Sequence, residues 1–215
     1  MSIIDTWDKE TCKAWDSFKK EEGLSEQQAA QFERYMTMLS EFNATTNITR
    51  IVEPKEVINQ HFKDSLALAH ARDLTTCRGI CDVGSGGGFP GIPLAIRFPE
   101  IAIILLEISQ KKRGFLQSVV DELKLASCQV MGEDYRTFIR STSYPIDYFV
   151  ARASLRPEDL IRAFNMPAYQ NAEVVYWASR HWEAEGAEKN CLSELYSYEL
   201  EGLSRFLAFF RRNNR

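Results

Sequence analysis

The amino-acid sequence predicts an α/β protein whose doubly wound, mostly parallel β-sheet follows an N-terminal helical extension. Three observations carry this prediction. Residues 1–74 have the apolar spacing of helices, whereas from residue 79 short apolar runs alternate with amphipathic segments. A glycine-rich stretch, CDVGSGGGFPGIPLAI at 81–96, follows the first of these runs. Such alternation is typical of a parallel sheet with helices on both faces, and we expect residues 75–215 to form one structural unit.

Two amphipathic segments predict helices in the extension. Residues 25–43 and 54–71 each place their apolar residues on one helical face, and Ser25 stands where an N-cap is expected. The apolar positions are Ala29, Phe32, Met36 and Leu39 in the first segment, and Val57, Ile58, Phe62, Leu66 and Ala69 in the second.

The second half predicts the sheet itself. The run at 101–107 is apolar throughout, as a strand covered on both faces should be. Residues 194–200 and 204–212 have no obvious helix between them, so we expect an antiparallel pair at the sheet edge. The other strands are expected at 79–84, 127–131, 146–152 and 172–178, and the helices at 109–124, 134–141 and 156–166.

Composition narrows the function classes. A net charge of −4 counts against a generic polyanion binder, although local basic runs occur at 111–113 and 211–215. The five cysteines include no C-x-x-C pair and only three histidines are present, so we expect no metal site and no disulfide framework. The chain lacks a membrane-length apolar run and a signal-peptide pattern, which predicts a cytoplasmic protein without membrane contact.

The glycine-rich stretch has the strand-to-helix context of a nucleotide-binding loop, although a purely structural turn is the alternative. No Lys-Ser or Lys-Thr follows it, so a phosphate-binding P-loop is excluded. Pro90 and Pro93 cannot donate an N–H, which disfavours a diphosphate ligand. Glu107 ends the next strand, where a carboxylate can accept both hydroxyls of a ribose. A nucleoside without phosphate, held in this way, indicates S-adenosylmethionine. Asp82 would then bind loop amides or face the cationic end of the ligand, and the alternative is that it only caps the end of the strand.

Two further stretches allow more than one interpretation. His61, Asp64 and Ser65 have helical i, i+3, i+4 spacing. His61 is either a structural histidine beside Asp64 or part of a cluster that lines the cleft and contacts RNA or orders the glycine-rich loop. The segment NMPAY at 165–169 is similar to the Asn-Pro-Pro-Tyr signature of amino-group methyltransferases, which directly follows the fourth strand. Here it comes one helix later, so we interpret it as a helix end and loop.

Several stretches together resemble the RsmG (GidB) family of methyltransferases, which modify N7 of one guanine in 16S ribosomal RNA. The likeness covers about 25–157 and implies a Rossmann-like class I methyltransferase fold with seven strands. It rests on YMTMLSEFNATTNITRI, QHFKDSLAL, DVGSGGGFPGIPLAI and LLEISQKKRGFLQSVVDELKL.

The resemblance also implies site residues, an S-adenosylmethionine cofactor, and 16S ribosomal RNA or the small ribosomal subunit as partner. Guanine N7 carries a lone pair and no proton, so no catalytic base is expected and Arg152 would lie nearest the methyl transfer. The implied cofactor contacts are Gly84, Gly86, Phe89, Glu107, Gly132, Glu133 and Arg152. The implied substrate contacts are His61, Asp64, Arg152 and Arg180.

The chain departs from the family pattern on the RNA-facing side. Met131 stands where an arginine is usual, Ala151 replaces a serine, and Arg180 lies near the position of a family lysine. Two alternatives therefore stay open: a methyltransferase of the same fold acting on a small molecule or protein, and a non-catalytic S-adenosylmethionine-binding regulator. The sequence leaves open the oligomeric state and whether the substrate is naked RNA or an assembled subunit.

Overall fold

The computed structural model describes residues 3–213, and its seven strands form one sheet in the order β3-β2-β1-β4-β5-β7-β6. Strands β1 to β5 are parallel, whereas β7 is antiparallel to both of its neighbours. The predicted mostly parallel, doubly wound sheet and its antiparallel edge pair are confirmed. The strands are β1 Gly79–Val83, β2 Ala102–Leu106, β3 Cys128–Met131, β4 Tyr148–Ala151, β5 Glu173–Ala178, β6 Leu192–Leu200 and β7 Leu203–Phe210.

The helices predicted from the sequence are present, and several of them differ in length from the prediction. Ser25 caps the second helix, because its side chain accepts the Gln28 N–H while the Gln28 side chain accepts the Ser25 N–H. That helix continues through Thr46. The α-helices are α1 Lys9–Glu22, α2 Glu26–Thr46, α3 Pro54–Glu56, α4 Asp64–Ala71, α5 Gly91–Arg97, α6 Gln110–Glu122, α7 Tyr135–Ser141, α8 Pro157–Leu160 and α9 Gly186–Cys191, and the 3₁₀ segments are η1 Ile3–Thr6 and η3 Ile161–Asn165.

The predicted helix at 54–71 contains a π-helical segment, η2 Val57–Lys63, between α3 and α4. Within it the chain is wound more widely, and the Asp64 N–H reaches back to the Asn59 carbonyl. Segments of this kind are often found at functional sites. The expected helix at 156–166 is α8 followed by the 3₁₀ turn η3, which ends at Asn165, so the interpretation of 165–169 as a helix end and loop is confirmed.

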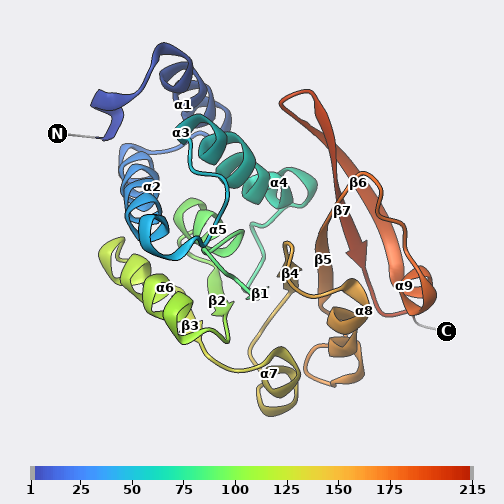
Figure 1. The fold of residues 1–215 in the computed structure, drawn as a ribbon. Helices are drawn as coiled ribbons and strands as arrows, with labels where there is room; N and C mark the ends of the chain where they lie inside the picture. The colour runs from blue at the N-terminus through green and yellow to red at the C-terminus, as the bar shows by residue number, and fades with distance from the viewer. Residues whose placement is uncertain (1–2, 214–215) are drawn as a thin grey trace.

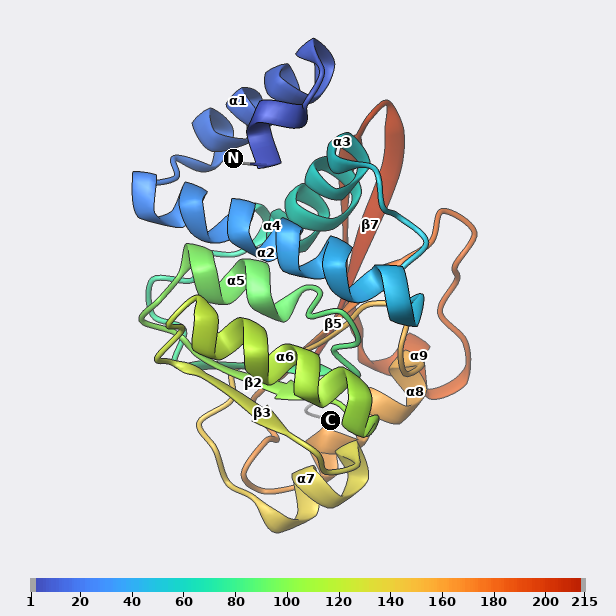
Figure 2. The same cartoon turned by 60° about the vertical axis from the view of Figure 1, so that its left-hand side comes forward.

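The N-terminal helices form an outer layer over one face of the sheet (Figure 1). Figure 2 shows α2 above α5 and α6, and α2 contacts both. Phe32 and Phe62 from the extension belong to the same buried cluster as Ile92 and Leu105. The opposite face is covered by α7, α8 and η3. The first seventy-odd residues therefore share a hydrophobic core with the sheet.

The turn of the β6–β7 hairpin lies beside this N-terminal layer (Figure 1). The Asn59 side chain of η2 donates to Glu201 at the hairpin turn over 2.7 Å. Tyr198 of β6 donates to Asp64 of α4, also over 2.7 Å. The hairpin and the segment from η2 to α4 thus meet beside the carboxyl ends of β4 and β5. No helix within residues 3–213 has the length and apolar content needed to span a bilayer.

Candidate functional site

Most of the predicted site residues lie at the carboxyl ends of the parallel strands. Gly84 follows β1, Glu107 follows β2, Gly132 follows β3 and Arg152 follows β4. The sheet order reverses between β1 and β4, and in open α/β sheets ligands bind at such a switch point. These four positions therefore surround the expected place of a ligand.

The glycine-rich loop uses its amides within the protein. The amides of Gly84 and Ser85 donate to the Leu106 carbonyl over 2.8 and 3.0 Å, and those of Gly88 and Phe89 donate to the Ser85 carbonyl. The Gly86 amide donates to Glu107 over 2.9 Å. A loop whose amides are engaged in this way is poorly suited to cradle a phosphate, which agrees with the argument from its prolines.

Glu107 is buried and spans the gap between the loop and β2. Its Oε2 accepts the Gly86 N–H and its Oε1 accepts the Ser109 N–H, each over 2.9 Å. Each oxygen keeps a second lone pair, so the carboxylate can still accept hydrogen bonds from two hydroxyls. The predicted contact between Glu107 and a ribose is therefore compatible with the hydrogen bonds that its two oxygens already accept.

Two carboxylates, one in β1 and one after β3, have a buried oxygen without a hydrogen-bond partner in the described residues. Asp82 Oδ2 accepts the Gly91 N–H over 2.9 Å, whereas Oδ1 has no partner. Burial raises the pKa of Asp82 to about 7. Glu133 Oε2 is likewise buried and unpaired. An acceptor withdrawn from water without a donor is unfavourable, so both positions favour a ligand that brings a donor.

Arg113 belongs to the basic run at 111–113, but its side chain is hydrogen-bonded within the protein. Its Nη1 donates to the Ile108 carbonyl over 2.6 Å, and a Cβ built on Gly132 would lie 2.9 Å from its Cζ. The guanidinium thus bridges the ends of β2 and β3. Ile108 beside it is 72% exposed, which provides an apolar contact on the side where an adenine is expected.

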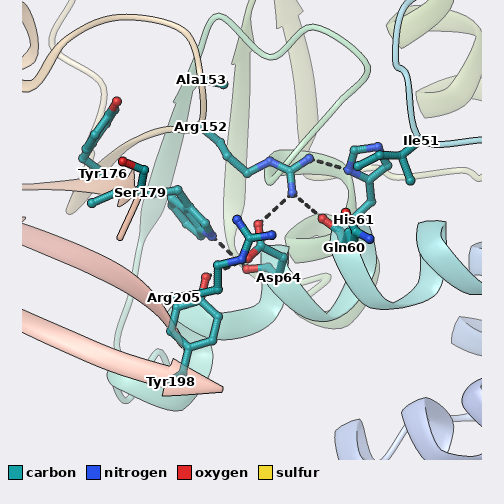
Figure 3. A pocket seen from close by; sticks show the side chains of 12 residues that line it. Ile51, Gln60, His61, Asp64, Arg152, Ala153, Tyr176, Ser179, Tyr198 and Arg205 are labelled. Carbon is teal, nitrogen blue, oxygen red and sulfur yellow. Dashed lines mark hydrogen bonds and ion pairs between the residues drawn. The ribbon is translucent and has the colours of Figure 1, made fainter. Parts of the chain in front are cut away.

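Arg152 is the centre of a buried network that joins three parts of the chain (Figure 3). Its Nη1 donates to Asp64 Oδ2 over 2.9 Å and to the Gln60 carbonyl over 3.0 Å. Its guanidinium also lies 5.1 Å from the centre of the Phe89 ring. Asp64 in turn accepts the Tyr198 hydroxyl through Oδ1, and its carbonyl accepts the indole N–H of Trp177 over 2.8 Å. The network therefore orients Arg152 before any ligand binds.

His61 is a neutral member of this network. Arg152 Nη2 lies 2.6 Å from Nδ1, and because an arginine only donates, Nδ1 must accept. The ring proton therefore resides on Nε2, 2.9 Å from the Thr49 hydroxyl. Burial and the positive charge of Arg152 lower the pKa of His61 to about 3. The imidazole is also stacked on Phe89 at 4.1 Å, so it fixes the loop against η2.

The low pKa of His61 makes stability depend on pH. The unfolded state binds a proton near pH 6.5 and the folded state does not, so stability is fully present above this pH and decreases as pH falls towards 3. Because the buried ring stays neutral, we expect the free energy of unfolding to be about 2 kcal/mol lower at pH 5 than at pH 8. Urea unfolding at both pH values measures this loss, and His61→Gln should reduce it.

His70 provides the matched control for that measurement. The hydrogen bond that His70 donates to the Glu22 carboxylate raises the pKa of His70, so its contribution is present below pH 6.5 and is lost as pH rises. His70→Gln should therefore change the pH dependence in the opposite direction. If the free energy of unfolding depends on pH equally in the wild type and in His61→Gln, the His61 ring is not buried in its neutral form.

A cavity of about 410 Å³ opens beside the network, at the carboxyl ends of β4 and β5. Its volume lies within the range of about 300–1,000 Å³ that small-ligand pockets have. Figure 3 shows Tyr176, Tyr198, Arg152 and Arg205 arranged around it. The full lining consists of Ile51, Gln60, His61, Asp64, Arg152, Ala153, Tyr176, Trp177, Ala178, Ser179, Tyr198 and Arg205.

A family model described as rRNA small subunit methyltransferase G (GidB) matches residues 28–202. The chain belongs to the GidB family. The protein named ribosomal RNA small subunit methyltransferase G from Desulfitobacterium hafniense (strain Y51) is 39% identical over 135 residues, which are 62% of this chain and 55% of that protein. The protein of the same name from Geobacillus kaustophilus (strain HTA426) is 38% identical over 140 residues, 64% of this chain and 59% of that protein. The chain thus spans little more than half of these curated relatives.

Solved structures of methyltransferases have the same architecture as this GidB family chain. A methyltransferase from Geobacter sulfurreducens superimposes with a TM-score of 0.60 at 11% identity, over 83% of this chain and 89% of that one. A SAM dependent methyltransferase from Aquifex aeolicus gives a TM-score of 0.55 at 12% identity, over 77% of this chain and 97% of that one. Identities this low concern the fold alone, and they confirm the Rossmann-like methyltransferase fold.

The structure brings His61, Asp64 and Arg152 of this GidB family chain together, but not Arg180. The Arg180 side chain is exposed, its Nε donates to His181, and it does not line the cavity. Its role in substrate binding stays a prediction. The described residues contain no group of three or more His, Cys, Asp or Glu side chains placed to hold a metal ion.

Several residues of the network and cavity were not singled out from the sequence, among them Trp177, Tyr198 and Arg205. Trp177 lies on β5, whereas Tyr198 and Arg205 lie on β6 and β7, opposite each other in the strand register. Alternation along β6 and β7 predicts which residues share a face, but the contact between Tyr198 and Asp64 joins residues 134 positions apart. Only the folded hairpin reveals it.

Proposed function

We propose that this chain transfers a methyl group from S-adenosylmethionine to N7 of a guanine in small-subunit (16S) ribosomal RNA. The family assignment and the names of the curated relatives support the reaction class. The absence of a free proton acceptor around the cavity, among the residues that the structure describes, supports N7 as the methyl acceptor.

The residues at the ends of β1, β2 and β3 fit the proposed cofactor. S-adenosylmethionine would supply a methyl group on a positively charged sulfur, from which a lone pair can displace it. Glu107 would accept the ribose hydroxyls, and the unpaired Glu133 Oε2 would accept a hydrogen bond from the adenine amino group. The Gly86 backbone leaves room for close approach, because the nearest atom to a Cβ built there is 3.9 Å away.

The cavity chemistry favours an acceptor that loses no proton. His61 has both ring nitrogens engaged and a pKa of about 3, so it does not accept a proton at neutral pH. Both oxygens of Asp64 are bound, one to Arg152 and one to Tyr198. Methylation of an amino or hydroxyl group needs a base to remove a proton, whereas guanine N7 attacks with its lone pair. Catalysis would then consist of positioning the base and the methyl group in line.

The cavity would also accommodate an RNA base that is no longer stacked on its neighbours. Tyr176, Trp177 and Tyr198 line it, and aromatic side chains are the usual stacking surfaces for unpaired bases. Arg152, already oriented by Asp64 and His61, would donate to the base or its phosphate. A guanine in an RNA loop would enter this cavity with less disruption than a paired one.

Mapping of N7-methylguanine by borohydride reduction and aniline cleavage tests the proposal. We expect one cleavage site in small-subunit rRNA from the parent strain, its loss in a strain without the gene, and its return with the wild-type gene. Unchanged cleavage in the deletion strain would rule out the rRNA substrate. Calorimetry with S-adenosylhomocysteine tests the cofactor separately, and uptake of this ligand without any rRNA change would point to another substrate or to a regulator.

A further inference from the structure

Arg205 is a cation of the cavity that forms no ion pair with any of the described residues. It projects from β7 beside Tyr198, its partner in the strand register. Its Nε is buried without a hydrogen-bond partner, and no carboxylate in residues 3–213 forms an ion pair with its guanidinium. Arg152, by contrast, is bound by Asp64, Gln60 and His61. A partly buried guanidinium without a partner is unfavourable, so this position favours an anion.

The charge of the cavity lining agrees with an anionic ligand. Two arginines, Arg152 and Arg205, face one carboxylate, Asp64, while His61 is neutral, so the lining is positive. The whole chain carries a net charge of −4, so the charge of this cavity lining is opposite in sign to that of the chain as a whole. Aromatic side chains line the same cavity. A planar base next to an anionic group is the chemistry of a nucleotide.

We propose that Arg205 binds a phosphodiester group of the nucleotide whose base is methylated. The inference rests on the proposed function and adds a positioning residue to it. Arg205 lies beyond residues 28–202 that match the GidB model, so the family likeness does not point to it. The cavity lies at the ends of β4 and β5, on the other side of β1 from Glu107 and Gly132, which separates this anion site from the ribose and adenine end of the cofactor.

The test measures binding of a small-subunit rRNA fragment as a function of salt concentration, with S-adenosylhomocysteine affinity as an independent readout. Arg205→Gln should weaken RNA binding about tenfold, because a charge-assisted hydrogen bond to phosphate is lost. It should also reduce the slope of log K against log salt by about 0.7, the value for one phosphate contact on a single strand. The affinity for S-adenosylhomocysteine should not change. Arg205→Lys should keep the salt slope and recover part of the affinity.

Arg140→Gln is the matched control. Arg140 is an exposed residue at the end of α7 that leads to the amino end of β4, the edge opposite the cavity. We expect wild-type RNA affinity and salt slope for this variant. Wild-type RNA binding by Arg205→Gln, with unchanged melting temperature, would overturn the proposal.

Two other outcomes separate this proposal from the proposed function. Loss of S-adenosylhomocysteine affinity in Arg205→Gln, with RNA binding retained, would assign the site to the carboxylate of the cofactor and overturn the phosphate assignment. A deletion strain with unchanged rRNA methylation would contradict the proposed function, while the RNA-binding measurements would still decide the role of Arg205. A wild-type protein that binds no RNA would overturn the phosphate site directly.

Discussion

Replacement of Asp64 by alanine is expected to lower the free energy of unfolding by about 3 kcal/mol, because one partner of a buried ion pair is removed. The side chains of Asp64 and Arg152 are only 10% and 15% exposed. Without the carboxylate, Arg152 keeps its charge in a buried place and Tyr198 loses its acceptor. The variant would therefore loosen α4, β4 and β6 together.

Asp159→Ala is the control for this measurement by urea unfolding. Asp159 pairs with Arg136 and Arg162, whose side chains are 55% and 47% exposed, so its removal should cost less than about 1 kcal/mol. Asp64→Asn should lie between the two, because it keeps the shape and loses the charge. If Asp64→Ala and Asp159→Ala are equally stable, Asp64 does not join the three elements as the contacts indicate.

The sheet was predictable from the sequence because its signals are local. An apolar run such as 101–107, covered on both faces, and the glycine stretch after β1 each reveal their element without knowledge of distant residues. The missing helix between 194–200 and 204–212 predicted the antiparallel edge. The short helix α9 before β6 carries no comparable apolar stripe and was not predicted.

The network around Arg152 was only partly predictable. The spacing of His61 and Asp64 placed them on one side of a helix, yet the two side chains meet through Arg152 rather than with each other. The π-helical turn at 57–63 changes the angle between such residues, and a pattern of period 3.6 does not reveal it. Tyr198 belongs to a strand whose partner in space, α4, is defined only by tertiary folding.

The sequence and the structure give different reasons for glycine at position 84. The sequence predicts that glycine is needed there so that the cofactor can approach the backbone. In the structure Gly84 has φ +72°, and a Cβ built on it would lie 2.6 Å from Ser154 Cβ. A side chain at this position would therefore be strained and would push apart the loop after β1 and the segment after β4. Contact with Ser154 provides a second reason for glycine.

A double-mutant cycle separates the two explanations. Gly84→Ala is expected to weaken S-adenosylhomocysteine binding by at least tenfold, since left-handed backbone strain and the Ser154 contact each cost about 1–2 kcal/mol. Ser154→Gly removes the opposing Cβ, although it also loses the hydrogen bond from Ser154 to the Val83 carbonyl. If the contact matters, the double variant should bind better than Gly84→Ala, with a coupling of about 1 kcal/mol. Calorimetry on the four proteins measures this coupling, and melting temperatures show which of them are folded. A double variant that binds as weakly as Gly84→Ala would instead favour direct approach of the cofactor to Gly84, as the sequence predicts.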